Sequence, residues 1–203
     1  MTLCEALPRG QFRERSIPVL ETKRLVLRAP RLEDAKTVAA LANDRRIAEN
    51  TARIPHPYKM ADAESFIKGA NKGGAGDAMF LITLRDKTLI GACGLRQQEE
   101  NSETPELGYW LGVPHWGNGY ATEALHAVID YAFTDLEHTA LQAGARVTNP
   151  ASRRVLEKCG FQWTGVGLYR INAIKSSAPI DRFRLERGIW SAIKDWGRAK
   201  KVM

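Results

Sequence analysis

The sequence has little of what marks a secreted, membrane-spanning or metal-dependent protein. Its three cysteines lack the spacing of metal ligands, so we expect no metal site. Cys93 lies in an apolar run and Cys159 on an apolar helical stripe, which predicts buried thiols and a reduced, cytoplasmic setting. No segment approaches the roughly 18 consecutive apolar residues of a membrane span. Residues 1–20 carry charges instead of the apolar stretch of a secretory signal.

The composition is that of an ordinary globular domain. A chain of 203 residues with 44% hydrophobic and 26% charged residues is long enough to bury one substantial core. The net charge of +7 is compatible with an anionic ligand, a ribosomal surface or a nucleic acid. No basic run with interleaved aromatic residues is present, however, which argues against direct recognition of RNA or DNA.

The segment 116–124, with the sequence WGNGYATEA, is the most informative part of the chain. A strand-like run at 106–112 precedes it, and apolar residues follow it at helical spacing: Ala121, Ala124, Leu125, Val128, Ile129, Ala132 and Phe133. A strand therefore leads through a two-glycine turn into a helix. The first N–H groups of a helix lack internal partners and attract anions, which predicts a phosphate or pyrophosphate site. A tight turn that needs glycine only for its backbone angles is the structural alternative.

A second segment, 147–161, reads as the end of a strand followed by a short helix. Asn149 suits the N-cap and Pro150 the first helical position. Gly160 suits the left-handed residue that ends a helix. The loop of 116–121 is neither a Walker A loop, because no Gly-Lys-Ser/Thr follows, nor a dinucleotide fingerprint, because a third glycine is missing.

These segments, in this order, resemble the GNAT superfamily of acyl-CoA-dependent N-acetyltransferases, and within it the branch of the ribosomal-protein alanine N-acetyltransferases. Residues 21–28 look like the first strand of that branch, residues 106–124 like its pyrophosphate loop, and residues 149–161 like its pantetheine-side helix. The resemblance covers roughly residues 20 to 190. It implies acetyl-CoA as the cosubstrate.

The expected fold is α/β (α+β), with one GNAT-like domain at 20–203 after an N-terminal extension at 1–19. The order of helical and strand-like runs predicts a single mixed sheet flanked by helices. The resemblance implies that this sheet is mostly antiparallel, with a splay between its two central strands. Monomer and homodimer both remain open.

The resemblance also implies which residues bind the cosubstrate. The backbone near Leu111 and Val113 would pair with the pantetheine arm. The loop would bind the pyrophosphate, and the short helix that begins at Pro150 would contribute Asn149 and Ser152. Trp116 stands where the family usually has Gln or Arg, so we expect backbone rather than side-chain contacts there. The loop residues are Trp116, Gly117, Asn118, Gly119, Tyr120, Ala121 and Thr122.

Two residues are candidate catalytic groups. Ser152 resembles the serine beside the CoA sulfur, where its hydroxyl would donate to the departing thiolate. Glu106 is a candidate general base, directly or through a water. His56 and bulk solvent are alternatives, because a histidine titrates near neutrality and a free α-amine has a pKa near 8. Glu123 favours the helix dipole but would repel phosphate, so we expect it to face away from the loop, toward a basic neighbour or the acceptor side.

The sequence thus predicts transfer of an acetyl group from acetyl-CoA to a primary amine by direct attack. The acceptor is either a protein N-terminus or a small amine. Four basic residues of the last third could favour an acceptor with a nearby negative charge, although a solvated basic face is the favoured explanation: Arg170, Lys175, Arg182 and Arg184. The rival hypothesis is a non-catalytic module on the same fold that binds CoA, RNA or the ribosome.

Overall fold

The computed structural model describes residues 17–72, 77–97 and 104–197. Most of the expected N-terminal extension therefore lies outside the described residues. The strands are β1 (Leu20–Glu21), β2 (Leu25–Arg28), β3 (Ala78–Leu84), β4 (Leu89–Arg96), β5 (Glu106–Leu111), β6 (Ala140–Arg146), β7 (Gln162–Ile171) and β8 (Ser176–Glu186). The helices are α1 (Ala35–Ala42), α2 (Arg45–Ala48), α3 (Met60–Asn71), α4 (Tyr120–Thr134), α5 (Pro150–Lys158) and α6 (Arg187–Gly197), with short 3-10 turns η1 (Leu32–Asp34), η2 (Val113–His115) and η3 (Asn172–Ile174).

All the strands join one sheet in the order β1-β2-β3-β4-β5-β6-β8-β7. Every neighbouring pair is antiparallel except β5 and β6. The expected fold class, a mixed and mostly antiparallel sheet flanked by helices, is confirmed. No described helix has both the length and the apolar composition that crossing a membrane requires.

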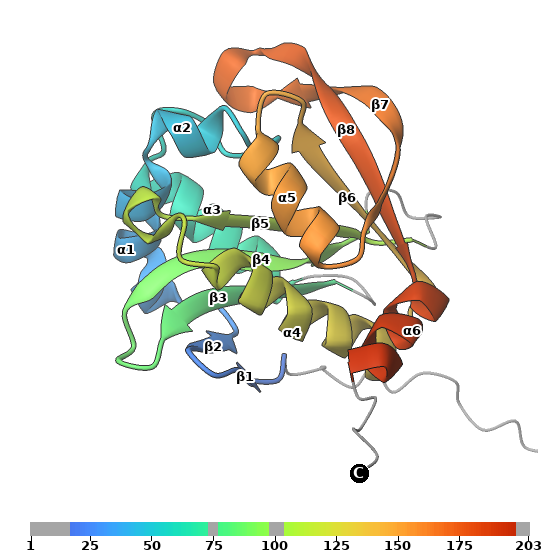
Figure 1. Ribbon diagram of the computed structural model, residues 1–203. Helices are drawn as coiled ribbons and strands as arrows, with labels where there is room; N and C mark the ends of the chain where they lie inside the picture. The colour runs from blue at the N-terminus through green and yellow to red at the C-terminus, as the bar shows by residue number, and fades with distance from the viewer. Residues whose placement is uncertain (1–16, 73–76, 98–103, 198–203) are drawn as a thin grey trace, which may run out of the picture.

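Helices cover both faces of the sheet (Figure 1). The α4 helix packs its apolar stripe against one face, and the fully buried Leu125, Phe133 and Phe183 belong to that core. The α1 and α3 helices cover the other face, where Val38 and Ile67 pack against Leu81. Strand residues alternate between these two cores because successive side chains point to opposite faces. The sheet therefore separates an α4–α5 face from an α1–α3 face.

The splay expected between the central strands is present. The whole of β5 pairs with β4, from Glu106 opposite Arg96 to Leu111 opposite Gly91. β6 pairs with β5 only at Glu106 and Leu107. Beyond that point the β6-β8-β7 half of the sheet diverges from the β3-β4-β5 half (Figure 1). A gap between β5 and β6 therefore opens in the middle of the domain.

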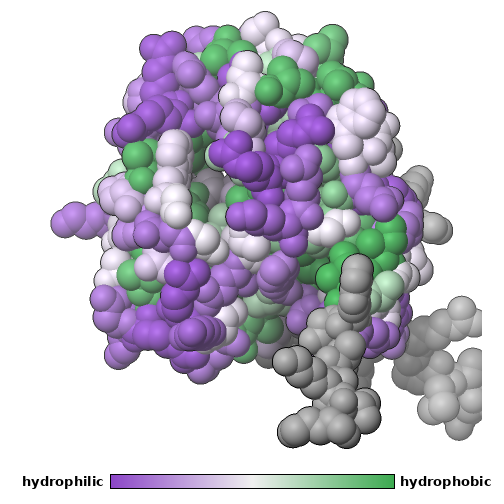
Figure 2. Space-filling view, in the orientation of Figure 1, coloured by the Kyte–Doolittle hydropathy of each residue, from purple (hydrophilic) through white to green (hydrophobic). Residues whose placement is uncertain are grey.

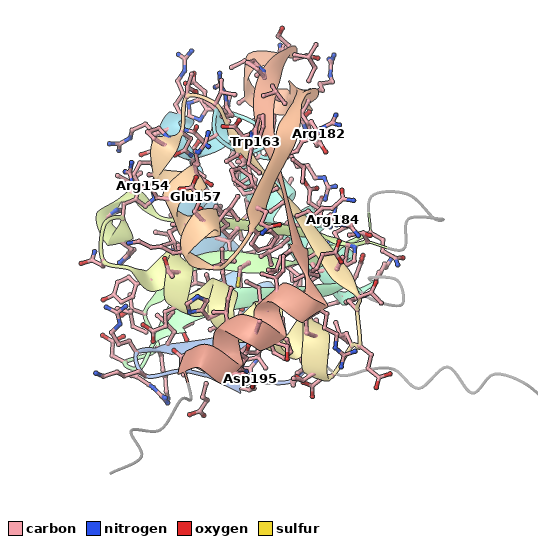
Figure 3. All side chains as sticks on the ribbon, turned by 45° about the vertical axis from the view of Figure 1, so that its right-hand side comes forward. Arg154, Glu157, Trp163, Arg182, Arg184 and Asp195 are labelled. Carbon is pink, nitrogen blue, oxygen red and sulfur yellow. The ribbon has the colours of Figure 1, made fainter. Side chains whose placement is uncertain are left out.

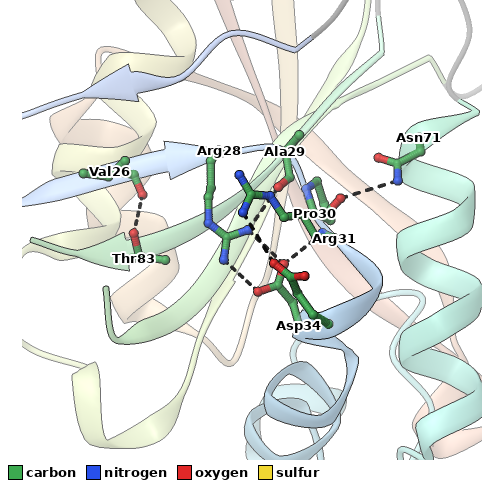
Figure 4. A network of polar contacts seen from close by, with 9 residues as sticks. Val26, Arg28, Ala29, Pro30, Arg31, Asp34, Asn71 and Thr83 are labelled. Atoms are coloured by element: carbon green, nitrogen blue, oxygen red, sulfur yellow. Dashed lines mark hydrogen bonds and ion pairs between the residues drawn. The ribbon is translucent and has the colours of Figure 1, made fainter. Parts of the chain in front are cut away.

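The start of α1 is tied to the sheet by an ion pair (Figure 4). The Arg28 guanidinium donates to both carboxylate oxygens of the buried Asp34, at 2.7 and 2.8 Å, and the Arg31 N–H donates to the same carboxylate at 2.8 Å. Burial alone would raise the pKa of Asp34, but these hydrogen bonds lower it below its ordinary value. The carboxylate is thus held ionised in the turn between β2 and α1.

Two local features differ from the sequence expectations. The expected first strand is broken into β1 and β2, because the Thr22 side chain accepts from the Leu25 N–H at 2.9 Å and forms a turn. The sequence analysis also did not identify the helix α2. Its N-cap, Asp44, accepts from the Arg46 N–H at 2.9 Å, so a new helix starts directly after α1.

Candidate active site

The backbone N–H and C=O groups of every second β5 residue point into the splay. The Gly112 N–H donates to the Ile90 carbonyl on the β4 side at 2.8 Å, and the Pro105 carbonyl accepts from Gln142 on the β6 side at 2.9 Å. Because polar backbone groups alternate along a strand, those of Tyr109 and Leu111 point toward β6. Among the described residues β6 offers them no ladder partner beyond Leu107. This is the arrangement that an extended, amide-containing ligand could complete.

The loop after β5 has the geometry that its glycines suggest. Gly117 and Gly119 have φ of 77° and 76°, the left-handed region that favours glycine. Gly119 is the N-cap of α4, and no side chain caps that helix. A Cβ built on Gly117 would meet no atom within 4 Å. The first N–H groups of α4 are therefore available to an anion that approaches the loop.

Arg24, on the turn before β2, stabilises this loop. Its Nη1 donates to the Asn118 carbonyl at 2.9 Å, and its guanidinium lies 4.7 Å from the centre of the Tyr120 ring. Its Nε and backbone N–H donate to the Glu123 carboxylate at 2.6 and 2.8 Å, and Thr22 donates to the same carboxylate at 2.7 Å. Burial alone would raise the pKa of Glu123, but these hydrogen bonds lower it. The expectation that Glu123 faces a basic neighbour is confirmed.

A cavity of about 410 Å³ lies between this loop, β5 and α5. The face shown in Figure 2 is hollowed left of centre, and strongly hydrophilic side chains gather beside the hollow. Four basic side chains that the sequence analysis did not single out also line the cavity: Arg46, His115, Arg154 and Lys158. Of the residues expected to bind the cosubstrate, nine line it: Leu111, Trp116, Gly117, Gly119, Tyr120, Ala121, Thr122, Asn149 and Ser152.

Val113 and Asn118 are not on the wall of this cavity. After Gly112 the chain leaves the strand for η2, so Val113 no longer continues β5. The Asn118 amide donates to the Trp116 carbonyl at 3.0 Å and therefore stabilises the loop from within. Trp116 is 44% exposed, and its indole N–H donates to the Leu111 carbonyl at 2.7 Å. The side chain in the family's Gln or Arg position thus engages the end of β5.

The helix α5 begins as expected. The Asn149 side chain accepts from the Ser152 N–H at 3.1 Å, Pro150 follows the cap, and Gly160 adopts φ of 88° after the helix. Ser152 lies within 2.8 Å of the Tyr109 hydroxyl. Burial raises the pKa of Tyr109 to about 12, so the phenol stays protonated and is able to donate to Ser152. Tyr109 also packs against the core on the α4–α5 face, and the sequence analysis did not anticipate this hydrogen bond.

A second, larger cavity of about 650 Å³ lies mainly on the α1–α3 face. Its walls come from α3, the segment between α2 and α3, β4, β5, β6 and the β7–β8 hairpin. Three residues of the splay region belong to both cavities: Tyr109, Trp110 and Ser152. The two cavities therefore meet at the splay. A ligand in one can present a reactive group to a ligand in the other.

Glu106 lines the larger cavity and His56 does not. Glu106 is partly buried on the α1–α3 face, and a Cβ on Gly144 of β6 would lie 3.8 Å from its Oε1. His56 is exposed and close enough to Asp44 for its charge to contribute to the lowered pKa of that carboxyl, after the larger effect of the Arg46 hydrogen bonds. Of the two side chains considered as base, only Glu106 borders a cavity that reaches Ser152.

The basic residues of β7 and β8 lie elsewhere. Arg182 and Arg184 project from β8 on the side away from α5, whereas Arg154 lies on α5 (Figure 3). None of the four basic residues considered for acceptor choice lines either cavity: Arg170, Lys175, Arg182 and Arg184. Arg53, Arg96 and Arg146 line the larger cavity instead. The sequence offered no periodic signal for them, because Arg53 lies in a proline-broken loop and the other two end strands.

Comparison with known proteins agrees with this geometry. Residues 24–162 match the family model described as an acetyltransferase (GNAT) domain. The chain is 32% identical over 155 residues to the uncharacterized N-acetyltransferase YoaA of Bacillus subtilis, which covers 73% of this chain and 85% of that protein. It is 36% identical over 83 residues to the ribosomal-protein-serine acetyltransferase of Escherichia coli, covering 41% of this chain and 46% of that protein.

Solved structures share the fold. An acetyltransferase of the GNAT family from Bacillus anthracis superposes with a TM-score of 0.73 at 20% identity, covering 84% of this chain and 99% of that one. The microcin C7 self-immunity acetyltransferase MccE, solved with acetyl-CoA and AMP, gives 0.70 at 20% identity over 81% and 93%. Spermidine N-acetyltransferase from Vibrio cholerae, solved with CoA and spermine, gives 0.71 at 23% identity over 84% and 99%. The chain belongs to the GNAT acetyltransferase family, as its motifs predicted.

Proposed function

We propose that the protein transfers an acetyl group from acetyl-CoA to a primary amine by direct attack at the splay between β5 and β6. The observation that carries this proposal is the meeting of two cavities at Tyr109, Trp110 and Ser152. One cavity borders a helix N-terminus without a side-chain cap, and the other borders a carboxylate. Two ligands held in this way would react as though at high local concentration.

The smaller cavity fits acetyl-CoA. The N–H groups at the start of α4 would bind the pyrophosphate, and Arg154 and Lys158 would add positive charge. The backbone of Tyr109 and Leu111 would pair with the pantetheine amides where β6 has diverged. The bound cosubstrate supplies the activated acetyl group. A backbone N–H of β5 would donate to the carbonyl oxygen as it gains negative charge.

Ser152 and Tyr109 would stabilise the departing thiolate together. The Tyr109 hydroxyl is the stronger acid of the two, so it donates to Ser152 Oγ and leaves the serine O–H free to donate to sulfur. Tyr109 then acts through Ser152 and is a positioning residue. This assignment does not require the serine to give up its proton fully, because a hydrogen bond to a developing charge is sufficient.

Glu106 would receive the proton that the attacking amine loses, directly or through a water. It lies on the α1–α3 face of β5, whereas Ser152 approaches from the α4–α5 face, and both border the larger cavity. The base and the thiolate donor would therefore act from opposite sides of the sheet. This arrangement suits an amine that enters from one side and a thioester held on the other.

The acceptor is a protein N-terminus or a small amine. Relatives carry names of both kinds, since one is a ribosomal-protein-serine acetyltransferase and one structural neighbour is a spermidine N-acetyltransferase. Cytoplasmic location stays a prediction.

A thiol-release assay tests the proposal. Acetyl-CoA is incubated with the protein and a panel of amino acids, polyamines, aminonucleotides and N-terminal peptides, and free CoA and the acetylated amine are both quantified. Amine-dependent CoA release with a matching acetylated product is the expected result. Binding of acetyl-CoA without turnover of any amine would favour a non-catalytic module. Failure to bind CoA at millimolar concentration would contradict acetyl transfer and a CoA-binding module alike.

A further inference from the structure

The larger cavity is lined by three arginines that form no ion pair among the described residues: Arg53, Arg96 and Arg146. Arg146 donates to the Glu49 carbonyl at 2.9 Å, so the argument concerns Arg53 and Arg96. Arg53 comes from the segment between α2 and α3, and Arg96 ends β4 directly opposite Glu106 on β5. Within residues 17–72, 77–97 and 104–197, neither guanidinium lies within 4.0 Å of a carboxylate oxygen. By contrast, Arg24 and Arg28 each bind a carboxylate at 2.6–2.8 Å.

Arg53 and Arg96 are close enough to repel each other. Burial lowers the pKa of Arg53, the positive charge of Arg96 lowers it further, and Glu106 and Asp77 partly offset these effects. Asp77 already accepts from the Gln97 N–H at 2.8 Å. Arg53 is exposed at the rim of the cavity and Arg96 is partly buried. Two neighbouring cations beside a cavity repel each other, and an anion bound between them would relieve that repulsion.

Both arginines are held in place by their backbones. The Asn172 N–H donates to the Ala52 carbonyl at 3.0 Å, and the Asn172 amide donates to the Arg53 carbonyl at 3.2 Å. Arg96 is fixed in the ladder with β5. When a ligand binds, the ordering cost is therefore confined to the two side chains.

We propose that the acceptor is a primary amine that also carries an anionic group, a carboxylate or a phosphate, and that Arg53 and Arg96 bind this group while the amine faces Glu106. The inference rests on the proposed acetyl transfer. Guanidinium groups bind carboxylate and phosphate oxygens in pairs, which would fix the distance between the anion and the amine. A zwitterionic acceptor matches a cavity wall on which arginines and carboxylates stand side by side.

The same charges disfavour polyamines. A polyamine carries positive groups only, so Arg53 and Arg96 would repel its remote amines and offset the attraction of the carboxylates in the same cavity. The aromatic side chains of Phe66, Trp110 and Tyr169 leave a cavity of about 650 Å³, which accommodates a small molecule or the first residues of a peptide. The shared chemistry is therefore an anion near an amine, from either source.

Paired acceptors test the charge requirement. Each pair differs in the anion alone: γ-aminobutyrate against its amide, O-phosphoethanolamine against ethanolamine, and an Ala-Glu peptide amide against the Ala-Gln peptide amide. Spermidine is the cationic reference. We expect the anionic member of at least one pair to have a kcat/KM about tenfold or more above its neutral partner, which is the effect of one charge-assisted hydrogen bond. The responding pair identifies the source of the anion.

Substitutions then locate the effect. Arg53→Gln and Arg96→Gln should each raise the KM for the anionic acceptor about tenfold and leave the neutral acceptor and the Kd of CoA unchanged. Arg96→Lys should restore part of the loss. Arg170→Gln is the matched control, because Arg170 is an exposed arginine outside both cavities. Equal losses for anionic and neutral acceptors would overturn the proposal.

A binding measurement separates this inference from the activity on which it rests. With CoA saturating, O-phosphoethanolamine should raise Tm in wild type but not in Arg96→Gln, and ethanolamine should have little effect. If this pattern appears but no amine is acetylated, the proposed function fails and the anion site stands. If neutral amines or spermidine are the better substrates, or if both compounds shift Tm equally, the anion site is wrong and acetyl transfer is unaffected.

Discussion

Arginine is used in opposite ways in the two halves of this site. Arg24 lies behind the loop of the smaller cavity, where Glu123, the Asn118 carbonyl and the Tyr120 ring satisfy it. Arg53 and Arg96 line the larger cavity without an ion pair among the described residues. A satisfied arginine stabilises a rigid loop, whereas an unsatisfied one is available to a ligand. The loop of the proposed cosubstrate half is therefore stabilised within the protein, whereas Arg53 and Arg96 of the acceptor half would be neutralised by the substrate.

The largest effect is expected from Gly119→Val, which tests the cosubstrate half. A branched side chain at the left-handed N-cap of α4 would strain the turn, and its Cβ would lie 3.5 Å from Arg24 Nη2, so the loop that presents the helix N–H groups would be distorted. Loss of two charge-assisted hydrogen bonds should weaken CoA binding about 100-fold or more, as measured by calorimetry. Gly165→Val is the matched control, because Gly165 also has positive φ, at 136°, and lies on β7 away from both cavities. Equal CoA affinity in the two folded variants would contradict the loop assignment.

Glu106→Gln tests the acceptor half. The amide keeps the shape of the carboxylate but cannot take a proton, so kcat/KM should fall about 100-fold at neutral pH. The loss should shrink as the pH rises toward the pKa of the acceptor amine, because more amine is then already neutral. CoA affinity should not change. Wild-type rates across the pH range would leave bulk solvent as the acceptor of the proton.

Ser152→Ala and Tyr109→Phe test the junction of the two cavities. If the serine hydroxyl acts on the developing thiolate, Ser152→Ala should lower kcat by about 10- to 100-fold with little change in the KM for acetyl-CoA. Tyr109→Phe should lower kcat by a smaller factor, and the double variant should resemble Ser152→Ala alone, because Tyr109 would act through the serine. Additive losses would show that the tyrosine acts independently.

Glu123→Gln should have the smallest effect, on stability and its dependence on pH. The folded-state pKa of Glu123 is below its ordinary value, so its contribution is fully present above the unfolded pKa of about 4.3 and is lost as the pH falls through the folded pKa. The variant should lose about 1–2 kcal/mol of the free energy of unfolding at pH 7, measured by urea denaturation. The difference from wild type should disappear in acid; a constant difference down to pH 2 would contradict the ionised pair.

The contrast between the halves also explains what the sequence could predict. The loop, α4 and α5 are built from contiguous segments whose glycines, cap and helical spacing leave a local signal, and the structure places nine of the eleven expected cosubstrate residues on one cavity wall. Val113 and Asn118 are the exceptions, because η2 bends the chain away from β5 and the Asn118 side chain turns back to Trp116.

The larger cavity could not be predicted from local sequence patterns. Its arginines come from segments about 40 residues apart and meet only because β4 and the segment before α3 border the same opening. Tyr109 and Ser152 are likewise separated along the chain, and no spacing between them predicts the hydrogen bond that they form beside the splay. Arg24 was visible only as part of a strand motif, although it forms the support of the loop.

An initial-rate grid with acetyl-CoA and the best acceptor, measured for Arg24→Gln and Arg96→Gln, tests the division of the site most directly. Arg24→Gln should raise the KM for acetyl-CoA about tenfold and leave the KM for the acceptor unchanged. Arg96→Gln should raise the KM for the acceptor by a similar factor and leave that for acetyl-CoA unchanged. If both substitutions change the same constant, or if neither changes any, the separate assignment of the two cavities is wrong.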